Sequence, residues 1–140
     1  MPTLEEAILL ATEAHRGQVD KAGMPYILHP LRVMFRMTSE EEMIAAILHD
    51  VIEDTPLTFE DLRALGYAEI VLEALDHLTH REGESYEAFI ERAALNPLAA
   101  RIKIADLEDN MDVRRIAEPQ DRDLERLRRY RRAWRRLTGR

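Results

Sequence analysis

The adjacent residues His49 and Asp50 end the apolar run 43–48, and this pairing constrains the fold more than any other feature of the chain. The run Met43-Ile44-Ala45-Ala46-Ile47-Leu48 has the composition of a helix that is buried on all sides. Burying an imidazole and a carboxylate there costs several kcal/mol unless both groups are paired or coordinate an ion. The chain must therefore bring compensating groups to this doublet, and a divalent cation is the natural one.

Helical start and stop signals divide the chain, and no stretch has a competing strand pattern. Thr3-Leu4-Glu5-Glu6 matches a capping box that opens a helix to about His15. Ser39 caps the helix that carries the doublet near its C-terminal end, and Pro56 closes that helix. The remaining helices are expected over residues 30–37, 58–65, 68–78, 85–95, 97–111 and 121–140, after a loop over residues 17–28. The pattern predicts an all-α fold that closes with an amphipathic C-terminal helix.

Length, charge and cysteine content narrow the class of protein. A chain of 140 residues has the size of one domain, so we expect residues 1–140 to form a single domain. Without cysteine, a metal must be held by histidine and oxygen ligands. We expect a cytoplasmic protein, since neither a signal peptide nor a membrane span is recognisable. The net charge of −7 disfavours general nucleic-acid binding.

The basic residues are unevenly distributed. Residues 121–140 hold nine arginines among apolar residues at helical spacing, and a solvated outer face explains them better than binding to nucleic acid or a membrane surface. Only two of the 20 basic residues are lysines, Lys21 and Lys103. Two explanations fit this scarcity equally: a codon preference for arginine, or a need for a compact point charge at these two positions.

Four residues can complete one metal site: His29, His49, Asp50 and Asp106. Two imidazoles and two carboxylates suit Mn²⁺, Fe²⁺, Co²⁺, Ni²⁺ or Zn²⁺ and leave positions for water and substrate. A cation there activates water and polarises a phosphate oxygen, so hydrolysis of a phosphoester or phosphoanhydride is the favoured reaction. Taken singly, His29 is more commonly a structural residue and Asp106 a cap or ion-pair partner. The other histidines receive no ligand role, although His15 could line the pocket (His15, His77, His80).

Helical spacing places further polar groups near the expected metal. Glu53 and Asp54 lie four residues after the two members of the doublet, on the metal-facing side, where they could manage the reaction's protons. In the later helix, Lys103, Asp106 and Asn110 fall on one stripe. Lys103 could therefore hold a phosphate or pair with the acids, and Asn110 could form a hydrogen bond to the substrate.

The order of His29, the doublet and Asp106 resembles the pattern that names the HD-domain metal-dependent phosphohydrolases. More of the chain, over about residues 4 to 115, resembles the hydrolase half of the RelA/SpoT-type ppGpp enzymes and the small stand-alone alarmone hydrolases. Several ordered motifs over that length are more specific than one short pattern. The segments that carry the resemblance are residues 14–18, 21–30, 49–55, 78–79, 103–106 and 110–111.

The resemblance implies an all-helical HD fold that binds one Mn²⁺, or another divalent transition metal, and a small phosphorylated nucleotide. The implied reaction is removal of the 3′-pyrophosphate of guanosine 3′,5′-bis(diphosphate), ppGpp, by metal-activated water. Neither a nucleic acid nor a membrane is implied as a partner, and the oligomeric state is not indicated. The implied roles are metal ligands His29, His49, Asp50 and Asp106, catalytic acids Glu53 and Asp54, and substrate-binding residues Lys21, Lys103 and Asn110.

Some positions depart from the family pattern and concern the substrate. Asp20 stands where the family usually has an arginine that helps to hold the base, and opposite charge cannot do the same work. Leu107-Glu108-Asp109 replaces arginine-leucine-histidine, and Val113 replaces a threonine. The first alternative is therefore an HD hydrolase of another phosphorylated nucleotide, such as a deoxynucleoside monophosphate or NADPH. The second is a regulatory module that binds metal and nucleotide without catalysis.

Overall fold

The computed structural model describes residues 1–140 and confirms the all-α fold, since helices and turns account for its regular structure. A single isolated bridge, between Val19 and Pro25, is the one pairing of extended residues. The α-helices are α1 (Leu4–Ala14), α2 (Leu28–Met34), α3 (Glu40–Ile47), α4 (Val51–Asp54), α5 (Phe59–Ala64), α6 (Glu69–His77), α7 (Tyr86–Ala94), α8 (Pro97–Asn110) and α9 (Asp121–Thr138), with a 3₁₀ turn η1 (Val113–Arg115) before α9.

Capping residues begin most of the helices where the sequence predicts them. The Thr3 hydroxyl accepts a hydrogen bond from the Glu6 N–H at 3.1 Å, and the Glu6 carboxylate accepts one from the Thr3 N–H at 2.8 Å. This capping box satisfies two backbone donors that the helix itself cannot pair. Side-chain caps also confirm the predicted starts of α3, α5, α7 and α8 (Ser39, Thr58, Ser85 and Asn96).

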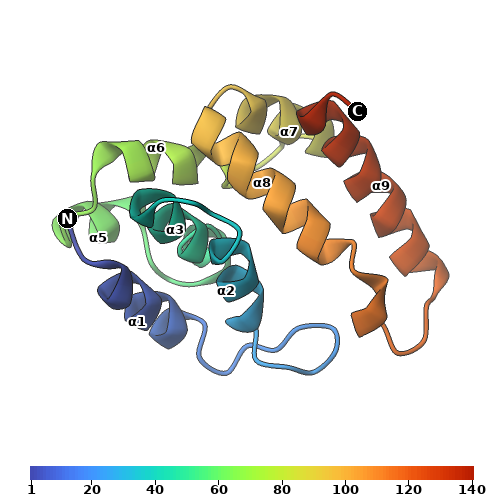
Figure 1. The fold of residues 1–140 in the computed structure, drawn as a ribbon, viewed down its shortest axis with the longest axis horizontal. Helices are drawn as coiled ribbons and strands as arrows, with labels where there is room; N and C mark the ends of the chain where they lie inside the picture. The colour runs from blue at the N-terminus through green and yellow to red at the C-terminus, as the bar shows by residue number, and fades with distance from the viewer.

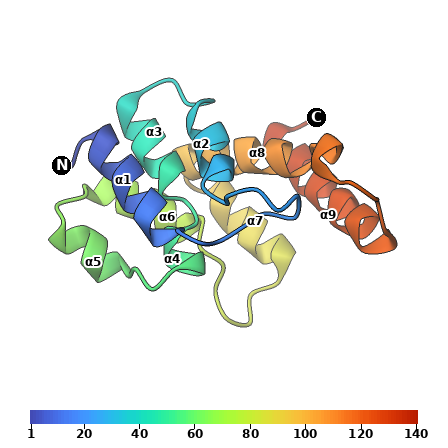
Figure 2. The same cartoon turned by 90° about the horizontal axis from the view of Figure 1, so that it is seen from below.

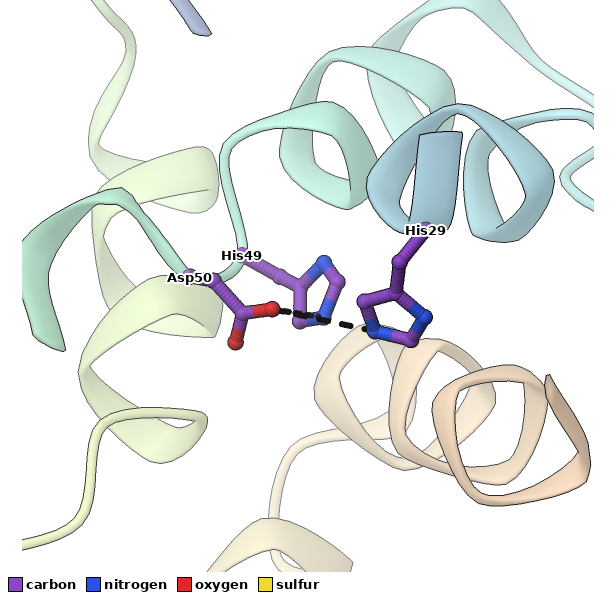
Figure 3. A group of neighbouring side chains, drawn as sticks. All are labelled: His29, His49 and Asp50. Carbon is purple, nitrogen blue, oxygen red and sulfur yellow. Dashed lines mark ion pairs between the residues drawn. The ribbon is translucent and has the colours of Figure 1, made fainter. Parts of the chain in front are cut away.

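The helix that was expected to carry His49 and Asp50 is interrupted, so that expectation was wrong. α3 ends at Ile47, and residues 48–50 form a turn before the short helix α4. The Val51 N–H donates to the Leu48 carbonyl oxygen at 3.1 Å, an i to i−3 bond that tightens the chain relative to an α-helix. This turn re-aims the doublet toward α2 and α8, as the side chains in Figure 3 show.

Helix α8 links two hydrophobic clusters. Figure 1 shows it running between the α2–α3 pair and α9. Its N-terminal part contributes Ala99 and Ile102 to the main core, together with Ile44 and Ile47 of α3. Its C-terminal part contributes Leu107 to a smaller cluster with buried residues of α7 and α9 (Ile90 and Ala133). Because α8 packs into both clusters, Lys103 and Asp106, which lie between Ile102 and Leu107, are held in a fixed position.

Helix α9 is the amphipathic closing helix that the sequence predicts. Its apolar side packs against the smaller cluster, and the Trp134 Nε1–H donates to Glu108 Oε2 at 3.1 Å. Its arginines lie largely on the exposed side. None of the helices combines the length and the apolar character that crossing a membrane requires.

Candidate metal centre and active site

The structure brings the four predicted metal ligands together from three elements. His29 comes from α2, His49 and Asp50 come from the turn after α3, and Asp106 comes from α8. The Nε2 atom of His29 lies 2.8 Å from Asp106 Oδ1, and the Nε2 atom of His49 lies 3.0 Å from Asp50 Oδ2. Donor atoms of His29, His49 and Asp50 all fall within 4.8 Å of one another (Figure 3). These atoms converge on one point from different directions.

In each ligand histidine, the outer nitrogen Nδ1, which points away from the centre, already has a hydrogen-bond partner. This leaves the inner nitrogen, Nε2, as the atom that can bind a metal. His49 Nδ1 lies 2.7 Å from the Ala46 carbonyl oxygen, and His29 Nδ1 lies 2.6 Å from Asp109 Oδ2. Both partners are acceptors, so each Nδ1 carries a proton, and it is Nε2 that can lose its proton and present a lone pair to a metal at the centre. The buried His49 Nε2 forms no hydrogen bond of acceptable geometry, although Asp50 Oδ2 lies 3.0 Å away. A buried nitrogen without a well-aligned hydrogen bond, among imidazole and carboxylate donors, fits a bound metal ion.

The electrostatics of the cluster also favour a bound cation. Burial lowers the pKa of His29, but its hydrogen bonds to Asp106 and Asp109 outweigh that effect and raise the pKa to about 9. Burial likewise opposes the charged form of His49, and the charge of Asp50 raises its pKa well above the usual value. Carboxylates that attract protons to these rings also attract a cation, and the two compete for the same nitrogen atoms.

The stripe on α8 surrounds the Asp106 carboxylate with donors. Lys103 Nζ lies 2.9 Å from Asp106 Oδ2, and Asn110 Nδ2 donates to Asp106 Oδ1 at 3.1 Å. The Lys103 ammonium also lies 5.0 Å from the centre of the Phe89 ring, within the range of a cation–π contact. Asp106, although buried, is thus charge-paired, and the pKa of its carboxyl lies well below its usual value.

Glu53 and Asp54 lie beside Asp50, as their spacing predicts, but both are exposed. The Glu53 Oε1 atom accepts a hydrogen bond from the His80 N–H at 2.7 Å, which fixes its position. Desolvation by the surrounding side chains, followed by the charges of Asp50 and Glu53, raises the pKa of Asp54 to about 6. A carboxyl with such a pKa can both accept and donate a proton near neutral pH.

Two cavities flank the metal centre and share Tyr26 and Asn110. The larger one, about 630 Å³, is lined by Asp50 and Asp106 of the centre, by both acids of α4, and by aromatic and basic residues. His80, which receives no ligand role from the sequence, lines this cavity as well. The residues that bring positive charge to this cavity are Lys103 and Arg129.

The smaller cavity, about 370 Å³, lies on the His29 side of the centre. In both overall views, the loop between α1 and α2 reaches toward the connection between α8 and α9 (Figures 1 and 2). Lys21 of that loop and Ile116 of that connection consequently line the same cavity. Of the three predicted substrate-binding residues, Lys103 lines the larger cavity, Lys21 the smaller one and Asn110 both.

Three of the positions that depart from the family pattern have different surroundings. Asp20 lines the smaller cavity, while its Oδ1 atom accepts hydrogen bonds from the N–H groups of Ala22 at 2.8 Å and Met24 at 3.0 Å. Val113 is 51% exposed and borders a neighbouring small pocket with Lys21. Leu107 is fully buried in the smaller hydrophobic cluster, so its treatment as part of a changed nucleotide pocket was wrong.

Several residues of the site were not found by sequence reasoning. The Tyr26 hydroxyl donates to Asp50 Oδ2 at 2.5 Å, and Asp109 contacts His29. Two arginines pair with Asp109 from other elements, Arg32 of α2 and Arg115 of η1. The available signal was the position of Asp109 three residues after Asp106, because that spacing places both carboxylates on neighbouring parts of one helix face.

Comparison with known proteins identifies relatives, although no protein-family model matches the chain. Over 122 residues, 77% of this chain, it is 37% identical to the bifunctional (p)ppGpp synthase/hydrolase SpoT of Escherichia coli (strain K12). Over 120 residues it is 32% identical to the guanosine-3′,5′-bis(diphosphate) 3′-pyrophosphohydrolase of Aquifex aeolicus, again covering 77% of the chain. The chain spans only 17% of the length of each of these curated relatives.

A solved structure supports the same relationship over nearly the whole chain. It is described as a metazoan orthologue of SpoT that hydrolyses ppGpp and plays a role in starvation responses. The two structures superpose with a TM-score of 0.83 at 27% sequence identity, covering 99% of this chain and 88% of the other. Motifs, fold and relatives agree, and the chain is therefore a homologue of the HD-type ppGpp hydrolase domains.

Proposed function

We propose that this chain removes the 3′-pyrophosphate of ppGpp with the help of a divalent metal, Mn²⁺, held by His29, His49, Asp50 and Asp106. The observation that carries the proposal is the convergence of two buried imidazoles with the carboxylates of Asp50 and Asp106, where the Nε2 atom of His49 forms no well-aligned hydrogen bond. The activities for which the relatives are named support ppGpp as the substrate. We further propose that residues 1–140 act as one catalytic domain. We also propose that the protein acts in the cytoplasm, with which a chain that contains no cysteine is consistent.

The donor set suits the metal. Two imidazoles and two carboxylates are typical ligands for Mn²⁺ and related ions, and four ligands leave coordination positions free on a six-coordinate ion. When bound, such an ion supplies a Lewis acid that polarises phosphate oxygens and lowers the pKa of water. The histidine rings are oriented for this task, because their Nδ1 atoms are already engaged by Ala46 and Asp109.

Proton transfer falls to the acids of α4. Hydrolysis to GDP and pyrophosphate needs one group that takes a proton from water and one that returns a proton to the O3′ oxygen. Asp54, with its pKa of about 6, can change its protonation state at neutral pH. Glu53 is its immediate neighbour, held by the His80 N–H and lining the same cavity. The two carboxyls are therefore the proposed acid–base pair.

Positive groups of the larger cavity would hold the phosphates. Lys103 is largely buried with its ammonium beside the ligand Asp106, so a phosphate near the metal centre would also meet this charge. Asn110 lines both cavities, and its amide can form a hydrogen bond to a nucleoside whose phosphates occupy the larger one. Lys21, in the smaller cavity, would contact the part of the nucleotide that lies away from the scissile bond.

Asp20 favours a second candidate, hydrolysis of a different phosphorylated nucleotide. Its carboxylate lies in the smaller cavity, where the family usually has a base-holding arginine. An acidic group there selects for hydrogen-bond donors on a ligand and against further anionic groups. Deoxynucleoside monophosphates and NADPH are therefore the compounds to compare with ppGpp.

The test is a hydrolysis assay of the purified chain with Mn²⁺ against ppGpp, deoxynucleoside monophosphates and NADPH. We expect release of pyrophosphate from ppGpp, and loss of that release after treatment with a chelator. Turnover of another nucleotide without pyrophosphate release from ppGpp would reverse the order of the two candidates. Binding of nucleotide without any product would instead favour a regulatory module. The matched variant His49→Gln keeps a polar side chain of similar length but should lose both metal and turnover.

A further inference from the structure

We propose that Asp109 is a positioning residue, which orients the ring of His29 and thereby sets the affinity of the centre for its metal. The proposal rests on the proposed metal centre described above. Asp109 Oδ2 lies 2.6 Å from His29 Nδ1, while the other ring nitrogen, Nε2, lies 2.8 Å from Asp106 Oδ1. Both nitrogens of the ring thus contact a carboxylate, and Asp109 is the one on the side away from the metal centre.

Carboxylate contacts of this kind have a known physical effect. An acceptor on the outer nitrogen fixes the tautomer of a ligand histidine, restricts rotation of its ring and raises the basicity of the inner nitrogen. His29 needs such help, because it comes from α2, whereas the other ligands come from the turn after α3 and from α8. Asp109 belongs to α8, the helix that also carries Asp106, so one helix fixes both sides of the ring.

Asp109 is itself held rigidly. The residue is 5% exposed, and its carboxylate accepts hydrogen bonds from Arg32 Nε at 2.7 Å and Arg32 Nη2 at 3.1 Å. The Arg115 Nη2 donates to the Asp109 backbone oxygen at 2.7 Å, and its guanidinium lies 3.4 Å from the carboxylate. Paired arginines offset the cost of burying this charge. They also come from α2 and η1, so three elements determine where Asp109 points.

A purely structural role is the competing explanation, since Asp109 and its arginines also tie α2 and η1 to α8. The chain contains a matched ion pair that separates the two roles. Glu108, the preceding residue, accepts from Arg36 Nη1 at 2.8 Å and from the Trp134 Nε1–H at 3.1 Å. It therefore links α8 to the residues that follow α2, whereas Asp109 links α8 to α2 itself, and it has no hydrogen bond or ion pair with His29.

The experiment measures the Mn²⁺ affinity of the metal-free 140-residue chain by titration, without nucleotide or turnover. We expect Asp109→Ala to weaken Mn²⁺ binding by roughly 10- to 100-fold, the range found for outer partners of metal ligands. Asp109→Asn retains an oxygen acceptor but not the charge, so its loss should be smaller. Glu108→Gln should leave the affinity within about twofold of the wild-type value, since the ligand rings are untouched. Circular dichroism establishes that each variant is folded.

Two results would overturn the proposal: unchanged Mn²⁺ affinity in Asp109→Ala, or an equal loss in Glu108→Gln. If Asp109→Ala does not fold, the comparison of Asp109→Asn with Glu108→Gln decides in its place. Wild-type protein that binds no divalent cation would overturn both this proposal and the metal centre. Wild-type protein that binds Mn²⁺ but leaves ppGpp intact would refute only the proposed substrate, and a selective loss of affinity in the Asp109 variants would still support the positioning role.

Discussion

Lys103 Nζ lies 2.9 Å from Asp106 Oδ2, and both side chains are largely buried beside the larger cavity. The other oxygen of Asp106 faces the two ligand histidines, at 2.8 Å from His29 Nε2 and 3.5 Å from His49 Nε2. One carboxylate therefore joins the proposed metal centre to a cation that can bind phosphate. Because helical spacing fixes Lys103 and Asp106 on one side of α8, their relationship is insensitive to movement of the loops.

The first prediction concerns Asp106 as a metal ligand. Asp106→Asn should remove most of the bound Mn²⁺ and lower turnover about 100-fold or more, because a neutral amide is a weaker ligand than a carboxylate. Metal content by mass spectrometry and helicity by circular dichroism are the measurements, and helicity should be retained. Glu87→Gln, an exposed change on α7, is the control. Unchanged metal content in Asp106→Asn would show that the ligand set is wrong.

The second prediction separates the acids of α4 from the metal ligands. Asp54→Asn should retain Mn²⁺ but lower kcat roughly 10²- to 10⁴-fold, the usual contribution of general acid–base catalysis. Glu53→Gln should also keep the metal and slow turnover, and its amide can still accept from the His80 N–H. Steady-state kinetics with parallel metal analysis measures both effects. Full activity in both variants would reassign proton transfer to other groups.

The third prediction concerns the pH dependence of folding in the metal-free protein. The pKa of His29 rises from 6.5 in the unfolded chain to about 9 in the folded one. A raised folded pKa stabilises the fold fully below pH 6.5, and this stabilisation is lost as pH rises toward 9. His49 changes in the same direction. The loss from His29 is on the order of 3 kcal/mol, at about 1.4 kcal/mol per pKa unit.

Urea unfolding of chelator-treated protein at several pH values measures this loss. In His29→Gln, the free energy of unfolding should fall less steeply with rising pH. Asp54 adds a separate loss at lower pH, because its raised pKa costs stability as pH climbs from 3.8 to about 6. Added Mn²⁺ should restore stability at high pH, where protons no longer compete for the imidazoles. A metal-free protein that becomes more stable between pH 6.5 and 9 would contradict the proposed electrostatics.

The fourth prediction tests the position of Leu107 in the core. Leu107→Ala should lower the free energy of unfolding by about 2–5 kcal/mol, since it opens a cavity between α7, α8 and α9. Leu107→Arg should cost more, because it also buries a charge without a partner. Leu9→Ala, at a position that is 69% exposed, should change stability by no more than about 0.5 kcal/mol. Equal stability of Leu107→Ala and wild type would place Leu107 outside the core.

The sequence by itself determined the helices and the chemistry of the centre. Thr3, Ser39 and Asn96 begin helices because their side chains bond to N–H groups three residues away, and such local signals can be read without tertiary contacts. The doublet His49-Asp50 in an apolar run required a partner charge, which limited its explanation to an ion or an ion pair. The spacing of Lys103 and Asp106 likewise fixed their contact within one helix.

Only the tertiary structure decided which distant groups meet. His29 and Asp109 are 80 residues apart, and their contact depends on how α2 packs against α8. The helix breaks before Val51 without any glycine or proline over residues 43–54 to signal it, and the resulting turn directs the doublet toward two other helices. Leu107 lies in the core and not in the pocket because α7 and α9 pack against its side of α8. Local hydrogen bonds set the elements, whereas burial and charge pairing between elements set the site.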